Sequence, residues 1–463
     1  MIKLILVIIF SLILSQEFIT EYLVINEDTL DNFVYQLPLS LDSPAPLIVV
    51  FHQWGGSAIS TIGTEFDNQA FARGWYFLSP WGGSSNNYNH QQAQYLWEQE
   101  ILWMMERFNI DSKRIYMVGG SMGGASGAIY ANNHLDPNKP MVAATASASG
   151  ILDCERRYYE MNGNNSMTEW FGGSPEEVPF EYHRNSAVFF GDSNHSMHKN
   201  LINTPLYLDF GATEPHRGHA EDLYNLLLGE HDNMWIETSS LNGHGFPVID
   251  EVHVCDWFSQ FELVTNPNIV NVNLDEPGRA YWAEAINIEN ERNFIKLFVE
   301  KEFEDFMDIG YNNFTRIELN NYENSDSLLL HIIDFKVDFL QINCNYELSN
   351  LNIGITGPLI NFVEYYEVST PVLTQQFNVQ NGIIWTNSDD LGFEDFVNNY
   401  RFYYSVNDIN FDFIWDVTDI ILTSNHILGN EILNEYQLSF ADLNQDYLIN
   451  IIDILFIVDL VIN

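Results

Sequence analysis

The sequence contains few basic residues. Its 463 residues include 18 Lys and Arg against 64 Asp and Glu, a formal net charge of −46 at pH 7. Contacts to nucleic-acid phosphates need clustered Lys and Arg, and anionic membrane surfaces attract the same side chains. The composition therefore argues against a nucleic-acid partner and disfavours anionic membranes. It is compatible with a calcium-binding segment and with adaptation to salt.

Cysteine is also scarce, with three residues at Cys154, Cys255 and Cys344. There is no C-x-x-C pair and no Cys/His cluster, so a zinc site is not expected. Cys154 and Cys255 are compatible with a disulfide and equally with two small buried apolar side chains. The sequence leaves both interpretations open.

The only long apolar run begins at Leu4, directly after Lys3, and extends to Leu14. A bilayer span needs about 20 apolar residues, so this run is too short. Its length and its basic flank are typical of a secretory signal peptide. We expect residues 1–16 to be a signal peptide, cleaved near Ser15, and the mature protein to be secreted, extracellular or cell-surface associated, without membrane insertion.

Residues 17–265 alternate short β-branched runs with stretches of helical periodicity. This alternation predicts an α/β fold with a mostly parallel sheet. The expected strands cover 47–51, 75–78, 115–118 and 206–210. The expected helices cover 91–108, 121–132 and 220–228.

The chain changes character after this region. Residues 266–357 are rich in β-forming runs separated by Asn-rich turns, which predicts a small all-β, sandwich-like module. Residues 358–401 are predicted to be a linker or extra strands. Residues 402–463 contain no Lys or Arg and carry an internal repeat, so we treat them as a separate C-terminal domain.

A nucleophile motif follows the predicted strand 115–118. Residues 119–124 read Gly-Gly-Ser-Met-Gly-Gly and precede a helix rich in small residues. This is G-x-S-x-G in the strand, sharp turn and helix context that places a serine at the sheet edge. The motif predicts Ser121 as the nucleophile and the backbone N–H of Met122 as an oxyanion donor.

A second oxyanion donor is expected in the loop after strand 47–51. Residues 51–56 read Phe-His-Gln-Trp-Gly-Gly. We expect the backbone N–H of Gln53 or Trp54 to donate, and His52 to fix the loop.

The catalytic base is expected to be a histidine late in this domain, because hydrolases of this type have the chain order Ser, acid, His. His244 lies between two glycines in the turn-rich stretch 242–247, where an imidazole can reach the serine. The competing histidines are predicted to be solvated surface side chains: His216, His219 and His231.

The acid is expected in a loop after a strand between the serine and the histidine. Glu214 follows strand 206–210 and takes this place. A glutamate can orient an imidazole and stabilise the imidazolium. Asp209 lies within the strand and Asp222 on the following helix, so both are weaker candidates.

Three stretches together resemble a known family, namely 51–56, 111–124 and 243–245. From about residue 46 to 261 the chain is similar to secreted α/β-hydrolases of the feruloyl esterase and polyhydroxybutyrate depolymerase group, which grade into prolyl oligopeptidase-like peptidases. The resemblance implies a serine esterase with an acyl-enzyme intermediate and no catalytic cofactor. Gln53 stands where the family usually has glycine, and Glu214 where it usually has aspartate.

The C-terminal repeat carries two loops at a spacing of 34 residues. Each places oxygen-bearing side chains at positions 1, 3, 5, 9 and 12 and is followed by an apolar helix, the spacing that a calcium ion requires. The predicted calcium ligands are Asp408, Asn410, Asp412, Asp416 and Asp419 in the first loop, and Asp442, Asn444, Asp446, Asn450 and Asp453 in the second.

This repeat resembles a dockerin, and the resemblance implies a structural calcium requirement and a cohesin-type protein partner. Position six is usually glycine, because the loop needs a positive φ there. Here it is Phe413 and Tyr447, so we expect weakened calcium affinity.

Together these features predict a secreted serine ester hydrolase. Its expected substrates are acetyl or feruloyl esters of polysaccharides, by association with the dockerin-like tail alone. The alternatives are a serine peptidase of the prolyl oligopeptidase-like type and a polyester depolymerase. A non-enzymatic module with a degenerate hydrolase domain is disfavoured because the predicted triad is intact.

Overall fold

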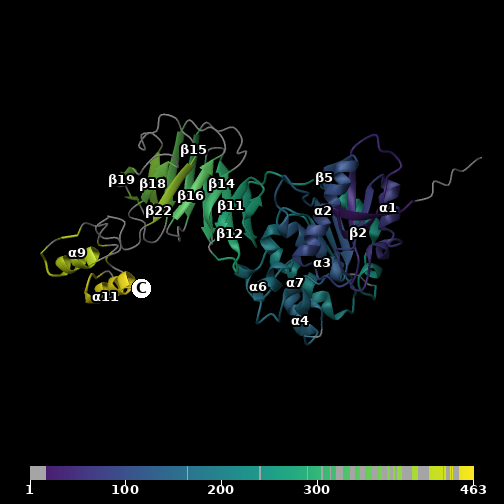
Figure 1. Ribbon diagram of the computed structural model, residues 1–463, viewed down its shortest axis with the longest axis horizontal. Helices are drawn as coiled ribbons and strands as arrows, with labels where there is room; N and C mark the ends of the chain where they lie inside the picture. The colour runs from purple at the N-terminus through teal and green to yellow at the C-terminus, as the bar shows by residue number, and fades with distance from the viewer. Residues whose placement is uncertain are drawn as a thin grey trace, which may run out of the picture. The chain divides into compact units, whose positions relative to one another are not determined.

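A computed structural model divides the chain into two compact units (Figure 1). The first comprises residues 1–134, 139–193 and 201–264, and the second comprises residues 135–138, 194–200 and 265–463. The structure describes residues 17–163, 165–238, 241–288 and 290–303, the strands between 306 and 404, and residues 417–430, 432, 433, 438, 441 and 448–462.

The first unit alternates strands and helices. Its strands are β1 (Ile19–Ile25), β2 (Asp28–Gln36), β3 (Ala45–Phe51), β4 (Tyr76–Pro80), β5 (Ile110–Gly120), β6 (Ala144–Ala148), β7 (Leu206–Phe210) and β8 (Met234–Thr238). Its helices are α1 (Phe66–Arg73), α2 (Gln91–Arg107), α3 (Met122–Asn133), α4 (Cys154–Glu160), α5 (Met167–Phe171), α6 (Pro179–Arg184), α7 (Gly218–Leu227) and α8 (Glu251–Phe258). Short 3-10 turns are η1 (Ala58–Thr61), η2 (Ser193–His195), η3 (His198–Leu201), η4 (Pro215–Arg217) and η5 (Phe246–Val248).

The eight strands form one sheet in the order β1-β2-β4-β3-β5-β6-β7-β8. β2 runs antiparallel to both of its neighbours, while the remaining pairs are parallel. Parallel neighbours need crossover connections, which the helices provide. The result is an α/β-hydrolase-like, mostly parallel sheet, and the prediction of an α/β fold for this part of the chain is confirmed. Each predicted strand and helix is present, with small shifts at the ends.

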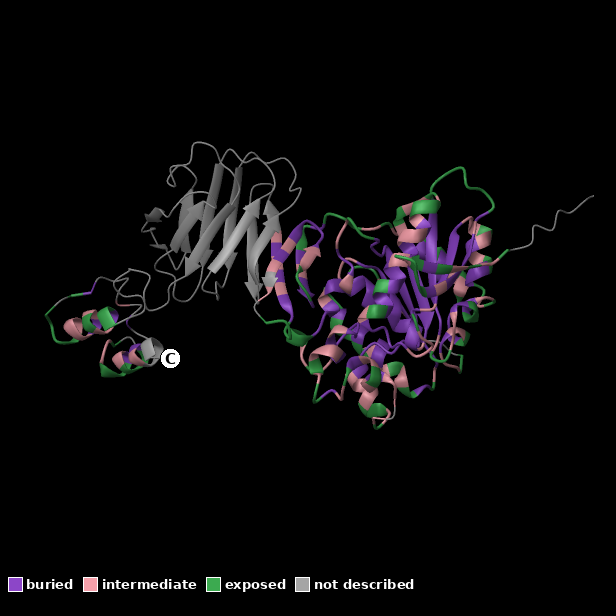
Figure 2. Ribbon diagram, viewed as in Figure 1, coloured by how far each residue is buried: buried purple, intermediate pink, exposed green. Residues whose placement is uncertain are grey.

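Strand β3 shows how the sheet builds two cores. Leu47, Val49 and Phe51 point into a cluster with α2, α3 and α7, whereas Ile48 and Val50 point into a cluster with α1 and α8. Successive side chains on a strand face opposite sides. A strand that is apolar at every position is therefore covered by helices on both faces, and Figure 2 shows these strands as buried.

The second unit pairs its strands in two sheets of seven, ordered β10-β11-β14-β16-β22-β18-β19 and β20-β21-β17-β15-β13-β12-β9. Strands within 358–401 belong to these sheets. The strands are β9 (Ile269–Leu274), β10 (Gly278–Ala280), β11 (Ala283–Ile288), β12 (Ile295–Phe303), β13 (Phe306–Asn312), β14 (Phe314–Leu319), β15 (Ser327–Ile333), β16 (Phe339–Cys344), β17 (Asn350–Thr356), β18 (Val363–Glu367), β19 (Leu373–Gln375), β20 (Val379–Gln380), β21 (Ile383–Asn387) and β22 (Asn399–Tyr404).

The C-terminal segment contains α9 (Val417–Ile427) and α11 (Ile451–Ile462). A small apolar cluster includes residues of both helices: Leu433, Ala441 and Ile457, with Ile420, Leu422, Leu438 and Ile449 packed against them. Among the described residues, no helix has both the length and the apolar character that a membrane crossing requires.

Cys154 and Cys255 are both free and buried. Cys154 lies at the start of α4 and Cys255 within α8, and they pack in separate apolar clusters. Burial raises the pKa of each thiol to about 12. The interpretation as two small apolar side chains is therefore the right one, and the disulfide interpretation is wrong.

Candidate active site

Ser121 occupies the sharp turn between β5 and α3. Its backbone has φ 57° and ψ −118°, a region that residues with a side chain rarely adopt. The turn is held by hydrogen bonds from the Ser121 N–H to the Ala148 carbonyl, at 2.8 Å, and from the Gly124 N–H to the Ser121 carbonyl, at 3.0 Å. The strained turn directs the Ser121 hydroxyl away from the end of β5.

The glycines around the serine are required by close backbone approach. A Cβ added at Gly123 would lie 2.5 Å from the carbonyl oxygen of His52 and 2.6 Å from that of Phe51. A Cβ at Gly119 would overlap the Gly123 carbonyl group. Any side chain at these positions would push α3 away from β5 or from the loop after β3.

His244 joins the other two predicted triad residues. Its Nε2 lies 2.7 Å from the Ser121 hydroxyl, and its Nδ1 lies 2.6 Å from a carboxylate oxygen of Glu214. The structure thus brings together three residues from the ends of different strands. Both contacts favour the neutral tautomer in which Nδ1–H donates a hydrogen bond to Glu214 and Nε2 accepts a hydrogen bond from the Ser121 hydroxyl.

Glu214 is much less exposed than His244: 4% of the Glu214 side chain is exposed to solvent, against 39% of the His244 side chain. Burial raises the pKa of its carboxyl group. Hydrogen bonds from His244 and from the Gly211 N–H, the latter at 3.0 Å, oppose this effect and lower the pKa below the usual value. The carboxylate is therefore ionised when it orients the imidazole.

The competing acids lie elsewhere. The Asp209 carboxylate accepts the Phe210 N–H at 2.7 Å, and its burial raises the pKa of this group to about 7. Asp222 pairs with Arg156 at 2.7 Å. The structure therefore favours Glu214 as the partner of the imidazole.

The prediction that the competing histidines are solvated is wrong for His219 and His231, while His216 is partly exposed. His219 is buried on α7, where its Nδ1 accepts the Asp153 N–H at 3.2 Å, and His231 is buried against the Thr204 carbonyl at 3.0 Å. His216 has 18% of its side chain exposed, and its ring centroid lies 5.8 Å from that of His244. His219 is buried by its inward-facing position on α7, and His231 is buried by contacts with residues distant in the sequence, which leave no local signal.

The predicted oxyanion donors lie directly after Ser121, at Met122, and in the loop after β3, at Gln53 and Trp54. Met122 is the first residue of α3, where backbone N–H groups have no intrahelical acceptor. The loop bearing Gln53 and Trp54 follows β3 and runs against α3, as the close approach of His52 to Gly123 shows. Trp54 is 58% exposed.

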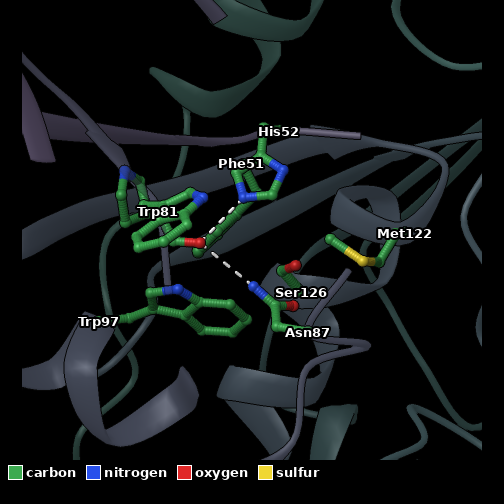
Figure 3. A pocket seen from close by; sticks show the side chains of 8 residues that line it. Phe51, His52, Trp81, Asn87, Trp97, Met122 and Ser126 are labelled. Carbon is green, nitrogen blue, oxygen red and sulfur yellow. Dashed lines mark hydrogen bonds between the residues drawn. The ribbon is translucent and has the colours of Figure 1, made fainter. Parts of the chain in front are cut away.

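His52 fixes this loop, as its motif position predicts. Its ring nitrogens lie 2.8 Å from the Gln53 carbonyl and 2.9 Å from the Trp81 carbonyl. The Trp81 carbonyl also accepts the Asn87 side-chain amide at 3.2 Å, and Figure 3 shows both bonds converging on it. Because both nitrogens face carbonyl oxygens, the ring is engaged in holding the loop.

The pocket drawn in Figure 3 is lined by Phe51, His52, Pro80, Trp81, Asn87, Trp97, Met122 and Ser126.

One side chain near the triad was not anticipated from the sequence. The Gln53 side-chain oxygen accepts the Phe246 N–H at 3.2 Å, across 193 positions of the chain. Sequence reasoning considered only the Gln53 backbone. The one available signal was the presence of glutamine where the resembled family has glycine.

Three predicted calcium ligands lie among the described residues. Asp419 and Asp453 are completely buried in the first turns of α9 and α11, and the Asp453 carboxylate accepts the Asn450 N–H at 2.8 Å. Within the described part of the chain, no group of three or more His, Cys, Asp or Glu side chains is arranged to hold a metal ion. The other predicted ligands lie outside the described residues: Asp408, Asn410, Asp412, Asp416, Asp442, Asn444 and Asp446.

No protein-family model and no curated protein matches this sequence. Among solved structures, the chain is similar to an S-formylglutathione hydrolase from Staphylococcus aureus, at 14% identity over 53% of this chain and 99% of that one, with a TM-score of 0.43. It is similar to a ferulic acid esterase at 14% identity over 53% of this chain and 96% of that one, with a TM-score of 0.39. It is also similar to the Pyrococcus horikoshii acylaminoacyl peptidase, at 17% identity over 53% and 40% of the two chains, with a TM-score of 0.41.

Proposed function

We propose that the first unit is a serine carboxylic ester hydrolase. The observation that carries this proposal is the continuous hydrogen-bonded line from the Ser121 hydroxyl through His244 to the Glu214 carboxylate. A serine hydroxyl is a poor nucleophile without a base that removes its proton. Here the base is in contact with the hydroxyl and is itself oriented by a buried, ionised acid.

In the first half of the reaction, the Ser121 oxygen attacks the ester carbonyl carbon while its proton passes to His244 Nε2. The negative charge that develops on the carbonyl oxygen is stabilised by the backbone N–H of Met122 and by an N–H from Gln53 or Trp54. When the tetrahedral adduct collapses, the ester C–O bond breaks. The leaving alkoxide takes the proton from His244, and an acyl-Ser121 ester remains.

In the second half, water replaces the alcohol. His244 takes a proton from the water molecule as the water oxygen attacks the acyl carbon. It then gives that proton to the Ser121 oxygen as the bond between this oxygen and the acyl carbon breaks. The acid is released and the enzyme is regenerated. Glu214 stabilises the imidazolium in both halves and keeps its charge throughout.

For the substrate, we propose acetyl or feruloyl groups on polysaccharides. The support is the dockerin-like tail, which associates the chain with polysaccharide degradation, and the exposed Trp54 ring in the proposed oxyanion loop. Aromatic faces of this kind stack on sugar rings and on phenolic acyl groups. A peptide bond or a polyester could be cleaved by the same triad, and these remain the alternative substrates.

For the tail, we propose a calcium-dependent docking domain that tethers the secreted enzyme to a cohesin-type partner. The positions of Asp419 and Asp453 support the metal, because each takes the twelfth place of a predicted calcium loop and lies in the first turn of the helix that follows it. Exposed apolar side chains on and beside the two helices support a protein partner: Val417, Ile421, Ile451, Ile452, Leu455 and Phe456.

A panel of three substrates tests the enzymatic proposal: nitrophenyl acetate, methyl ferulate and a peptide anilide. We expect turnover of at least one ester and none of the anilide, with all activity lost in Ser121→Ala. Cleavage of the anilide alone would identify a peptidase. No turnover of any of the three by the folded wild-type chain would favour a non-catalytic module.

A further inference from the structure

We propose that the side chain of Gln53 is a positioning residue that holds the His244 loop against the nucleophile. The inference rests on the proposed function. The predicted role of Gln53 in the oxyanion loop concerns only its backbone N–H, and the role proposed here belongs to its side chain. It comes from how the loop carrying His244 is held at its two ends.

Before His244, the loop is held by the segment that carries Glu214. The Ala212 N–H donates to the Leu241 carbonyl at 3.0 Å, and the Thr213 hydroxyl bonds the Asn242 side chain at 3.0 Å. Gly211 lies so close to the Gly243 carbonyl that a Cβ there would overlap it. The segment that carries the acid is therefore joined to the chain preceding the base at three successive positions.

After His244, the loop is held by Gln53. The Gln53 side-chain oxygen accepts the Phe246 N–H at 3.2 Å. Gly245 lies between His244 and this bond with φ +73°, and a Cβ on it would overlap the same oxygen. The backbone therefore passes Gln53 at a distance that only glycine permits.

Gln53 also touches the nucleophile turn. A Cβ added at Gly120 would lie 2.8 Å from the Gln53 side-chain oxygen. The Gln53 carbonyl, in turn, accepts the Gly56 N–H at 2.9 Å and faces the His52 ring. One side chain thus links the oxyanion loop, the residue before Ser121 and the residues after His244.

The consequence concerns the angle of the imidazole. Glu214 fixes one edge of the ring, but the ring can still swing about the Glu214 contact unless the chain after His244 is fixed as well. Loss of the Gln53 acceptor leaves the Phe246 N–H without this hydrogen bond, and we expect His244 Nε2 to move away from Ser121. A displacement of about 1 Å in a catalytic group can cost on the order of 100-fold in rate.

The test compares Gln53→Met, Gln53→Glu and Gln260→Met in the full chain. Methionine keeps the length of the side chain and removes the acceptor, glutamate keeps an acceptor, and Gln260 is an exposed control beyond α8. We expect Gln53→Met to lower kcat for nitrophenyl acetate on the order of 10- to 100-fold, with KM nearly unchanged. The control should match the wild type.

Gln53→Glu should recover most of the lost kcat. A merely structural role would not give this rescue of kcat by a variant that keeps the acceptor. Hydrogen exchange at residues 245–248 should be faster in Gln53→Met and near the wild-type rate in Gln53→Glu.

Two results would overturn the proposal. Wild-type kcat and exchange in a folded Gln53→Met variant would show that the bond positions nothing. Equal loss in the Met and Glu variants would show that the acceptor is irrelevant. A wild-type chain that neither turns over the ester nor reacts with a fluorophosphonate would instead sink the proposed function, while the exchange measurement would still decide the role of Gln53.

Discussion

Glu214 combines burial with ionisation, and its environment explains how. Burial opposes the charge, but the carboxylate accepts hydrogen bonds from the His244 ring and the Gly211 N–H, which lower its pKa. A neutral amide of the same shape would accept one bond and present N–H groups to the other partner. It would also favour the wrong tautomer of His244.

We therefore predict that Glu214→Gln lowers kcat on the order of 1,000-fold, less than the loss in Ser121→Ala or His244→Ala, because the acid contributes less than the nucleophile or the base. Steady-state kinetics on a nitrophenyl ester measures this. A variant with the wild-type rate would show that another acid, such as Asp209 or Asp222, orients the imidazole.

The same substitution should change how stability depends on pH. Since the folded-state pKa of Glu214 is lowered, its carboxylate contributes stability above the ordinary value of about 4.3, and this contribution is lost as the pH falls through the lowered value. Urea denaturation should show Glu214→Gln less stable than the wild type at pH 7, with the difference shrinking toward pH 3. A difference that does not vary with pH would contradict this assignment.

Helix α2 carries two buried acids that should respond to pH in opposite directions. Glu100 is completely buried beside Asp31, and burial together with the Asp31 charge raises its pKa well above the usual value. Glu98 is also buried, which raises its pKa, but contacts with His134 at 3.2 Å and Lys139 at 3.4 Å outweigh this effect and lower the pKa below the usual value. One acid is therefore favoured in its neutral form and the other in its charged form.

We predict that Glu100→Gln raises the stability of the first unit at pH 7, because the folded state no longer has to keep a proton that the unfolded chain releases. The gain should disappear below about pH 4.3, where the unfolded chain also holds the proton. Glu98→Gln is the matched control and should lower stability at pH 7. Urea denaturation at pH 7 and pH 4 decides, and the same sign for both variants at pH 7 would refute the assignment.

Local sequence signals determined much of this unit in advance. The continuous apolar run of β3 predicts a strand covered on both faces, and the glycines around Ser121 predict a tight turn. Gln53 and Phe246 could not be paired in this way, because a contact across 193 positions leaves no local pattern. The sequence also could not decide whether Cys154 is a free thiol or half of a disulfide, since a buried apolar position and a disulfide both favour cysteine.

At the scale of the whole chain, we propose a catalytic unit whose triad chemistry uses no metal and a tail that binds calcium. The proposed triad uses a serine, an imidazole and a carboxylate, whose chemistry needs no metal. The predicted calcium loops lie in residues 402–463, where the described Asp419 and Asp453 are buried. An ion that binds only the folded tail would stabilise that tail by mass action.

We therefore predict that calcium raises the unfolding temperature of the tail in the full chain while kcat stays unchanged. Calorimetric scans with calcium and with a chelator, alongside ester hydrolysis under both conditions, measure the two effects. Asp453→Ala should weaken the calcium shift without changing kcat. A scan that is identical with millimolar calcium and with chelator would leave the repeat without a metal-binding role.

The most direct test of the central claim is the reaction of the folded chain with a fluorophosphonate, followed by mass spectrometry of the labelled peptide. A serine activated by His244 and Glu214 should react on Ser121 and on no other serine. Labelling should be absent in Ser121→Ala and slowed on the order of 1,000-fold or more in His244→Ala. A label on another serine, or wild-type labelling in either variant, would contradict the assignment of Ser121, His244 and Glu214 as the catalytic triad.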